Sequence, residues 1–298
     1  YVIGFFILAR FAAKIHDEGA SGKIYSFPEF LNRKYIPDND PTFAHAFGGV
    51  ISGINIFIFF FLLAAQFVGM AALLEFSFDI GFRTAAIISC LVVIAYTAFA
   101  GLSGVIITDT VQFIIIIFMI LAIFIPGILI DTEDFARLHE LPGEFLNGTF
   151  YGIGFLVALP LFIAPSVLVR MDLWQRLLAA KSGKVAKRVS IWSGIGMLPF
   201  YLIFPLVGMA VRLVTDESVD PRYAAYLFLD QHTTEIMLGF AVVGLLSALM
   251  SSGDSFLNII SISAVRDFPG RRKRSSSKKV IQKQIRITTV IFGGAALV

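Results

Sequence analysis

The feature that most constrains this chain is a series of long stretches without a charged residue. A helix needs about 20 consecutive apolar residues to cross the hydrocarbon core of a bilayer, whereas a membrane β-barrel alternates apolar and polar residues. The continuous pattern found here predicts an all-α polytopic membrane protein with eight membrane segments, the outer two incomplete. The charge-free stretches are residues 1–9, 46–74, 84–108, 110–130, 145–169, 189–211, 236–253 with 255–265, and 287–298.

Composition supports this class. Hydrophobic residues make up 57% of the chain and charged residues 15%, against about a quarter charged in soluble domains, which argues strongly against a soluble enzyme. The single cysteine, Cys90, excludes a disulfide framework or a thiolate metal site. Because both ends fall inside apolar runs, we expect residues 1–298 to be one transmembrane domain truncated at both ends.

The orientation in the membrane follows from the basic residues, which collect in cytoplasmic connections. Lys and Arg are concentrated after the fifth and seventh segments, and alternation then places two acidic connections, 131–144 and 215–235, outside. The predicted cytoplasmic loops are 10–45, 170–188 and 266–286.

Three local signals refine this topology. Gly101-Leu102-Ser103-Gly104 offers a turn that divides the long stretch 84–130 into two helices. Ser26 or Pro28 is expected to open a short surface helix in the first cytoplasmic loop. Residues 172–188 are expected to form an amphipathic helix on the inner leaflet.

Asp109 is the first polar residue whose presence in a membrane helix is energetically unfavourable. An ionisable group inside the hydrocarbon costs several kcal/mol and normally faces a partner or a water-filled path. Asp109 is flanked by Thr108 and Thr110, with Gln112 one turn on. It is predicted either to bind a cation or to be an interfacial aspartate solvated at the inner surface.

A stripe of small and hydroxyl-bearing residues marks the seventh segment. Ala248, Ser251, Ser252 and Ser255 fall at i, i+3, i+4 and i+7, so they share one helix face. Such a stripe either lets a neighbouring helix approach closely or offers neutral oxygens to a monovalent cation. A divalent cation would want more carboxylates.

Asp254 and Asn258 lie one turn apart on the adjacent face. They are predicted either to bind each other or to line a hydrated inner vestibule. The four histidines lie in loops or at segment ends, where solvation is expected rather than a function; they are His16, His45, His139 and His232. No cluster with metal-ligand spacing and no nucleophile set is present, so a membrane-embedded enzyme is disfavoured.

The fifth segment is rich in glycine and proline, including Pro160 and Pro165. This composition predicts a kinked or interrupted helix, and broken helices are where secondary transporters place substrate. Ser166 in this segment and Gln66 in the second are polar enough to face a substrate cavity. Gln66 is equally suited to satisfy a neighbouring backbone group.

Together these residues resemble the sodium/solute symporter family, which includes bacterial sodium/proline, sodium/galactose and sodium/sialic acid transporters. The stretch through Thr108-Asp109-Thr110-Val111-Gln112 is the most specific. The resemblance rests on Phe27–Tyr35 (FPEFLNRKY), Tyr96–Gln112 (YTAFAGLSGVIITDTVQ), Asp172–Lys181 (DLWQRLLAAK) and Ala248–Ser255 (ALMSSGDS).

The resemblance implies a fold of two inverted five-helix repeats, in which the segments here correspond to core helices two to nine. It also implies sodium ligands: the backbone carbonyl of Ala248 and the hydroxyls of Ser251 and Ser252 match the eighth-helix half of the family's main sodium site. Asp109 matches the fifth-helix aspartate associated with sodium coupling, which some members of the family use at a second sodium site near those serines. The contacts that the family takes from its first helix have no counterpart in these segments.

The resemblance further implies a sodium-coupled symporter of a small organic solute that works by alternating access in a plasma membrane, in the bacterial case the inner membrane. Sodium is the coupling ion, and no other cofactor, no enzymatic activity and no nucleic-acid partner are expected. The alternative is a sensor or input domain that keeps the fold without net transport. Substrate identity, sodium stoichiometry and oligomeric state are not fixed by these motifs.

Overall fold

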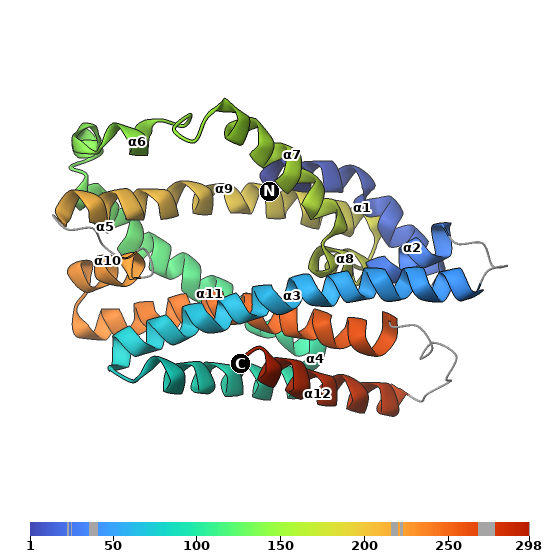
Figure 1. Ribbon diagram of the computed structural model, residues 1–298. Coiled ribbons are helices and arrows are strands. Elements are labelled where there is room, and N and C mark those ends of the chain that lie inside the picture. Colours follow the sequence, from blue (N-terminus) through green and yellow to red (C-terminus); the bar gives the residue numbers. More distant parts are fainter. Residues whose placement is uncertain are drawn as a thin grey trace. The chain divides into compact units, whose positions relative to one another are not determined.

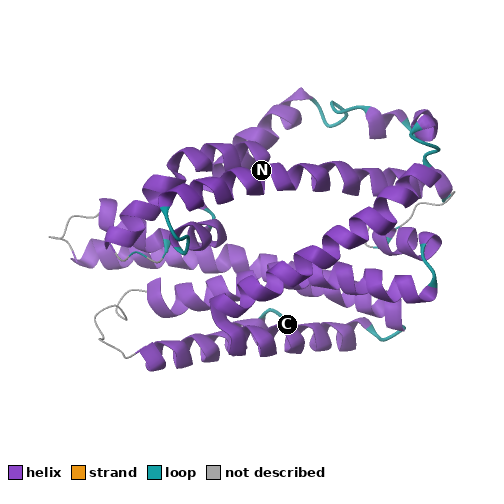
Figure 2. Cartoon of the chain, turned by 180° about the vertical axis from the view of Figure 1, so that it is seen from behind, coloured by secondary structure: helices purple, strands orange, loops and turns teal. Residues whose placement is uncertain are grey.

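The computed structural model describes residues 1–22, 24, 26–35, 41–215, 220, 223–267 and 278–297, and these residues form helices, turns and loops without a strand (Figure 2). The helical elements are α1 (Val2–Gly22), α2 (Phe27–Tyr35), α3 (Pro41–Phe78), α4 (Phe82–Met119), η1 (Ile120–Phe124), α5 (Ile125–Asp131), η2 (Ala136–Glu140), α6 (Gly143–Leu146), α7 (Ile153–Val169), α8 (Met171–Leu178), α9 (Gly183–Val214), α10 (Ala224–His232), α11 (Glu235–Ile262), η3 (Ser263–Asp267) and α12 (Lys278–Ala295). The predicted all-α class is therefore confirmed.

Six of the eight predicted membrane segments lie in helices that are long and apolar enough to cross a bilayer. Within the described residues these helices are His45–Phe78, Phe82–Phe99, Val105–Asp131, Gly183–Val214 and Glu235–Asp267, together with the bent pair Ile153–Val169 and Met171–Leu178 taken as one span. The first and last predicted segments are also helical, as α1 and α12, but both helices contain charged residues. The polytopic membrane class is confirmed, while the assignment to core helices two to nine stays a prediction.

The predicted cytoplasmic loops contain helices of their own. Helix α1 runs on to Gly22, and α2 begins at Phe27, which confirms the short surface helix predicted at Ser26 or Pro28. The single amphipathic helix predicted over 172–188 is wrong, because α8 ends at Leu178 and α9 begins at Gly183. The side of the membrane on which these connections lie stays a prediction.

The chain divides into two compact units, each with its own core. Unit 1 contains Tyr1–Phe57, Asn147–Tyr201 and Ile262–Lys278; unit 2 contains Ile58–Leu146, Leu202–Ser261 and Lys279–Val298. The expectation that residues 1–298 act as one transport domain stays a prediction.

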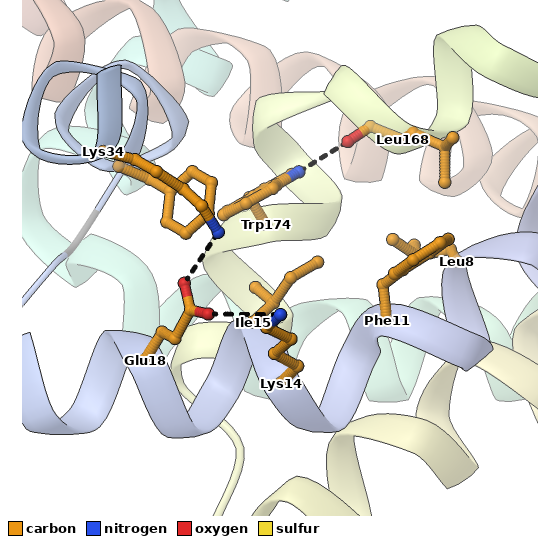
Figure 3. A pocket seen from close by; sticks show the side chains of 9 residues that line it. Leu8, Phe11, Lys14, Ile15, Glu18, Lys34, Leu168 and Trp174 are labelled. Carbon is orange, nitrogen blue, oxygen red and sulfur yellow. Dashed lines mark hydrogen bonds and ion pairs between the residues drawn. The ribbon is translucent and has the colours of Figure 1, made fainter. Parts of the chain in front are cut away.

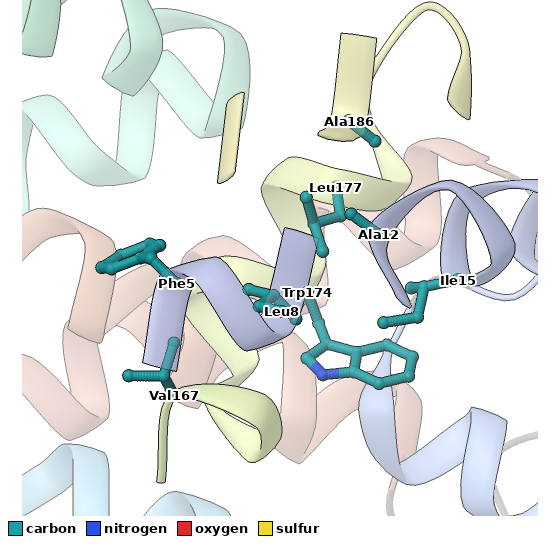
Figure 4. Packing of buried hydrophobic residues seen from close by; sticks show 8 residues of the cluster. All are labelled: Phe5, Leu8, Ala12, Ile15, Val167, Trp174, Leu177 and Ala186. Atoms are coloured by element: carbon teal, nitrogen blue, oxygen red, sulfur yellow. The ribbon is translucent and has the colours of Figure 1, made fainter. Parts of the chain in front are cut away.

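The core of unit 1 is built where α1 packs on α7, α8 and the start of α9. Figure 4 shows the side chains that fill it, with the Trp174 indole beside Leu8 and Ile15. The Trp174 Nε1–H donates to the Leu168 carbonyl at 2.7 Å, and the rings of Phe27 and Phe30 from α2 each lie 4.9 Å from the indole. One side chain therefore joins three helices. The buried members are Phe5, Leu8, Ala12, Ile15, Val167, Trp174, Leu177 and Ala186.

Gly4 lets α1 approach α7 closely. A Cβ added at Gly4 would lie 2.6 Å from the Ala164 carbonyl oxygen and 2.7 Å from Val167 Cγ2. Overpacking of this kind usually costs about 1–3 kcal/mol, so Gly4→Ala is expected to lower the midpoint of thermal unfolding. The matched control is Gly196→Ala in α9, where a Cβ would meet nothing within 4 Å; equal midpoints for the two variants would contradict this packing.

In unit 2, the second part of α3 lies beside α11 and α12 (Figure 1). Phe59 of α3 contacts Phe256 of α11, with ring centroids 5.5 Å apart, and Phe60 contacts Phe292 of α12. Helix α4 joins the same bundle, since the Cys90 thiol donates to the Gly293 carbonyl.

Helix α4 reverses direction between Tyr96 and Asp109. Both side chains hydrogen-bond to neighbouring positions on α11, Tyr96 to Asp254 and Asp109 to Ser251. In Figure 1 both ends of α4 lie on the same side of its middle, so the helix bends back on itself. The predicted turn at Gly101–Gly104 is wrong, because α4 is one helix from Phe82 to Met119 and its backbone stays helical there.

The prediction that His232 is solvated is wrong. Its Nε2 lies 2.9 Å from Asp131 Oδ1, and the two side chains are only 10% and 9% exposed. The ring also stacks on Phe228 of its own helix, and Gly127 of α5 leaves room for both rings. The pair joins the end of α5 to the end of α10, a contact between positions 101 residues apart.

A π-helical turn precedes α5. Proline at position 126 has no N–H, and its ring displaces the carbonyl four residues earlier, at Ala122. Ala122 is the middle residue of η1, where the helix widens to five-residue spacing. Pro126 therefore accounts for the local widening of this apolar span.

Candidate functional site

Asp109 and Ser251 meet in unit 2. The Ser251 hydroxyl donates to Asp109 Oδ1 at 2.6 Å, and both side chains are half-buried. The two residues are 142 positions apart, in two different candidate spans. This hydrogen bond is compatible with a cation ligand and with an interfacial aspartate, and both alternatives stay predictions. That the pair binds an ion stays a prediction.

The position of Ser251 follows from the packing of α11 between α3 and α4. Its Gly253 lies against Leu63 and Gln66 of α3, and a Cβ there would be 3.7 Å from Gln66 Cβ. Residues at 250, 251 and 254 therefore turn towards α4, because they lie on another side of the helix. Gly253 is not part of the stripe of Ala248, Ser251, Ser252 and Ser255, whose role in packing stays a prediction.

Ala248 and Ser252 are half-buried and lie between the α3 and α4 contact faces of α11. They share this intermediate face with Ser255. The predicted ligand set thus falls into two groups. Ser251 contacts Asp109 directly, whereas Ala248 and Ser252 lie on the neighbouring face of α11.

Tyr96 and Asp254 form a second polar contact of α4 with α11. The Tyr96 hydroxyl lies 2.9 Å from Asp254 Oδ2 and 3.1 Å from the Met250 carbonyl oxygen. Asp254 is fully buried, and Asn258 is 5% exposed. Asp254 is thus bonded to Tyr96. A role of Asp254 and Asn258 in lining an inner vestibule stays a prediction.

Sequence reasoning gave Tyr96 no role of its own. Its signal was present in the sequence, since a tyrosine in the middle of an apolar span needs a partner for its hydroxyl. Only the reversal of α4 shows that this partner is Asp254.

The two predicted substrate residues lie in different units. Gln66 is half-buried on the side of α3 that faces Gly253. The Ser166 hydroxyl donates to the Ile163 carbonyl of its own helix at 2.7 Å. A local hydrogen bond of this kind satisfies the hydroxyl without a substrate, and a substrate role for either residue stays a prediction.

The break in the fifth segment lies later than its prolines indicated. Pro160 and Pro165 are both inside the continuous helix α7, and the chain bends by 44° between α7 and α8. Arg170 stands at the bend, where its guanidinium binds Asp172 through two hydrogen bonds of 2.9 and 2.7 Å. This bidentate pair fixes the start of α8.

Unit 1 carries a groove of about 280 Å³ between α1, α2 and α8. Its walls are apolar, with the Trp174 indole at the base (Figure 3). Lys14 and Lys34 stand at its rim, and both approach Glu18, at 3.9 and 3.5 Å. The single Glu18 carboxylate balances only one of the two lysines, so the charged residues that line the groove leave a positive charge at its rim.

The described residues contain no group of three or more His, Cys, Asp or Glu side chains that could hold a metal ion. Sodium does not need such a group, because hydroxyl and carbonyl oxygens are suitable ligands for a hard monovalent cation. The oxygens around Asp109 and Ser251 are of this kind.

Comparison with known proteins supports the family that the motifs indicated. Residues 6–132 match the model of the sodium:solute symporter family. Sodium/proline symporters of Staphylococcus aureus, among them those of strains RF122, JH9 and Newman, are 25% identical over 299 residues, which is 95% of this chain and 55% of each relative. The chain therefore spans about half the length of these relatives. The predicted resemblance is confirmed.

Proposed function

We propose that this chain, a relative of the sodium:solute symporters, forms the core of a sodium-coupled transporter that carries a small organic solute by alternating access. The observation that carries the proposal is the 2.6 Å hydrogen bond between Ser251 and Asp109, which brings the two separate sodium motifs of the sequence together. Both motifs lie in candidate membrane spans. Sodium-coupled transport needs an ion site of this type at membrane depth.

The residues around Asp109 suit a monovalent cation. One carboxylate balances a single positive charge, and the hydroxyls of Ser251 and Ser252 with the carbonyl of Ala248 supply neutral oxygens. A divalent cation would want more carboxylates in its shell. Sodium is the abundant hard monovalent ion that matches the family relationship.

Coupling follows if sodium binds one arrangement of the helices better than another. A ligand shifts a conformational equilibrium only by its differential affinity for the two states. We propose that sodium stabilises an outward-open arrangement that binds solute, with Gln66 and Ser166 as candidate solute contacts. Solute and ion then leave past Asp254 and Asn258 on the inner side.

Proline is the first solute to test, because the relatives are sodium/proline symporters. The full-length parent protein is reconstituted into proteoliposomes, and uptake of labelled solutes is measured with an inward sodium gradient. Uptake is expected to rise at least tenfold over a potassium gradient of equal size for one solute of the panel. The expected location in the cell is the plasma membrane of a bacterium.

Thermal unfolding of the same protein supplies an independent readout. A ligand that binds the folded state raises its stability by mass action, so sodium together with the transported solute is expected to raise the unfolding midpoint. If sodium raises the midpoint but no solute is taken up, a sensor or input domain replaces the transporter. If neither occurs, the proposed ion coupling is wrong.

A further inference from the structure

The groove of unit 1 is amphipathic along its length. Figure 3 shows the apolar side chains of Leu8, Phe11 and Leu168 on one side and the charged side chains of Lys34 and Glu18 on the other. A ligand that lies along the groove therefore contacts apolar side chains at one end and charged groups at the other.

The indole at the base of the groove has no free hydrogen-bond donor. The Trp174 Nε1–H is the only donor of that side chain, and it already donates to the Leu168 carbonyl at 2.7 Å. The groove volume of about 280 Å³ lies just below the range of about 300–1,000 Å³ that is usual for small-molecule pockets. The apolar end therefore fits part of a hydrocarbon chain better than a polar solute.

The rim of the groove attracts an anion. The ammonium groups of Lys14 and Lys34 lie 3.9 and 3.5 Å from the two carboxylate oxygens of Glu18, one ammonium at each oxygen. The lysine side chains are 71% and 41% exposed, so these ion pairs are weak and leave both ammonium groups available. Because both groups already flank one carboxylate, their flexible side chains can also reach one phosphate beside it.

The groove belongs to a part of the chain that lies at the membrane. Leu168 and Trp174 are in the bent pair of α7 and α8, which together form a candidate span. Along α1, charged residues begin at Arg10 after an apolar run of nine residues. The rim therefore lies where an apolar helix surface gives way to charge, which is the level at which a phospholipid joins its acyl chains to its phosphate. Anionic headgroups attract basic residues at this level.

We propose that this groove binds one anionic phospholipid, with an acyl chain against Leu8, Phe11 and Leu168 and the phosphate at Lys14 and Lys34. The proposal goes beyond the proposed function and does not rest on it, because it needs only the membrane location of unit 1. The net positive rim selects the lipid by the charge of its headgroup, while the apolar end holds its chain.

The test is lipid binding by the purified full-length parent in detergent, measured by native mass spectrometry with dioleoyl phosphatidylglycerol or dioleoyl phosphatidylcholine. The two lipids share their chains and differ in net headgroup charge. One net basic residue is expected to lower the apparent Kd of the anionic lipid about fivefold relative to the neutral lipid. Lys14→Gln combined with Lys34→Gln is expected to abolish this preference. The matched control combines Lys184→Gln with Lys187→Gln, two exposed lysines of α9 in the same unit, and is expected to keep it.

Phe11→Asn tests the apolar end of the groove. Phe11 is 51% exposed, so its replacement leaves the core of unit 1 in place but removes an apolar wall. It is expected to raise the apparent Kd of both lipids about fivefold and to leave the preference between them unchanged. Phe6→Asn is the control, because Phe6 is 42% exposed on the same helix and does not line the groove.

Inorganic phosphate distinguishes a lipid from a free anion. At the concentration of the lipid it is expected to displace no phosphatidylglycerol. Displacement by phosphate, equal binding of the two lipids by the wild type, or an unchanged preference in the double lysine variant would each overturn the proposal. Unchanged binding in Phe11→Asn would overturn it as well, since the acyl chain would then lie outside the groove.

Discussion

Asp109→Asn in the full-length parent is expected to abolish sodium-driven uptake of solute. Asparagine has nearly the same shape, and its amide oxygen can still accept the hydrogen bond from Ser251, now 2.6 Å from the carboxylate. What it lacks is the negative charge. Removing one member of a buried charge pair usually costs about 2–5 kcal/mol, which corresponds to a loss of roughly 30-fold or more in sodium affinity.

The measurement is the initial rate of uptake as a function of sodium concentration. The wild-type rate is expected to saturate with sodium, whereas the variant rate is expected to stay near the sodium-free level at all concentrations used. Asp230→Asn removes an exposed carboxylate from the same unit and serves as the matched control. A variant at Asp109 that retains the wild-type sodium curve would refute the role assigned to this carboxylate.

The variants Ser252→Ala and Ser251→Ala test which of the two faces of α11 binds sodium. Ser251 bonds directly to Asp109, so its loss should weaken sodium binding even when Ser252 is intact. An uptake assay in which only Ser252→Ala has an effect would place the ion on the face shared with Ala248 instead.

The second large effect is expected on folding, from Trp174→Ala. The indole is 4% exposed, contacts Phe27 and Phe30, and donates a hydrogen bond of 2.7 Å to Leu168. Truncation of a buried tryptophan usually costs about 3–5 kcal/mol. Since the indole joins α2, α7 and α8, its loss should lower the unfolding midpoint and expose α2 to protease.

The chain contains a natural control, because it has only two tryptophans. Trp192 in α9 is 68% exposed, so Trp192→Ala should change the unfolding midpoint little. Trp174→Phe should lie between the two, since phenylalanine keeps part of the ring contacts but cannot donate to Leu168. Equal midpoints for the alanine variants at 174 and 192 would show that the core of unit 1 lies elsewhere.

Much of the candidate site could be predicted from the motifs, but its connections could not. Asp109 and Ser251 were assigned to one ion site by resemblance, and the structure places them in contact. Tyr96 was part of the same motif, yet its partner depends on the reversal of α4, which no local pattern specifies. His232 looked solvated for the same reason, since Asp131 is 101 positions away.

The amino-acid sequence by itself determined which segments are helical and able to cross a membrane. The bilayer requires an apolar helix wherever the chain spans it, and each segment meets this requirement through its own residues alone. Only the tertiary structure decided which polar groups meet: Ser251 with Asp109, Tyr96 with Asp254, and Arg170 with Asp172 at the bend between α7 and α8. The first two pairings depend on how α4 folds back against α11, and the third on where the fifth segment bends. The physical reason is that contacts between distant helices are set by packing geometry, which hydropathy along the chain does not encode.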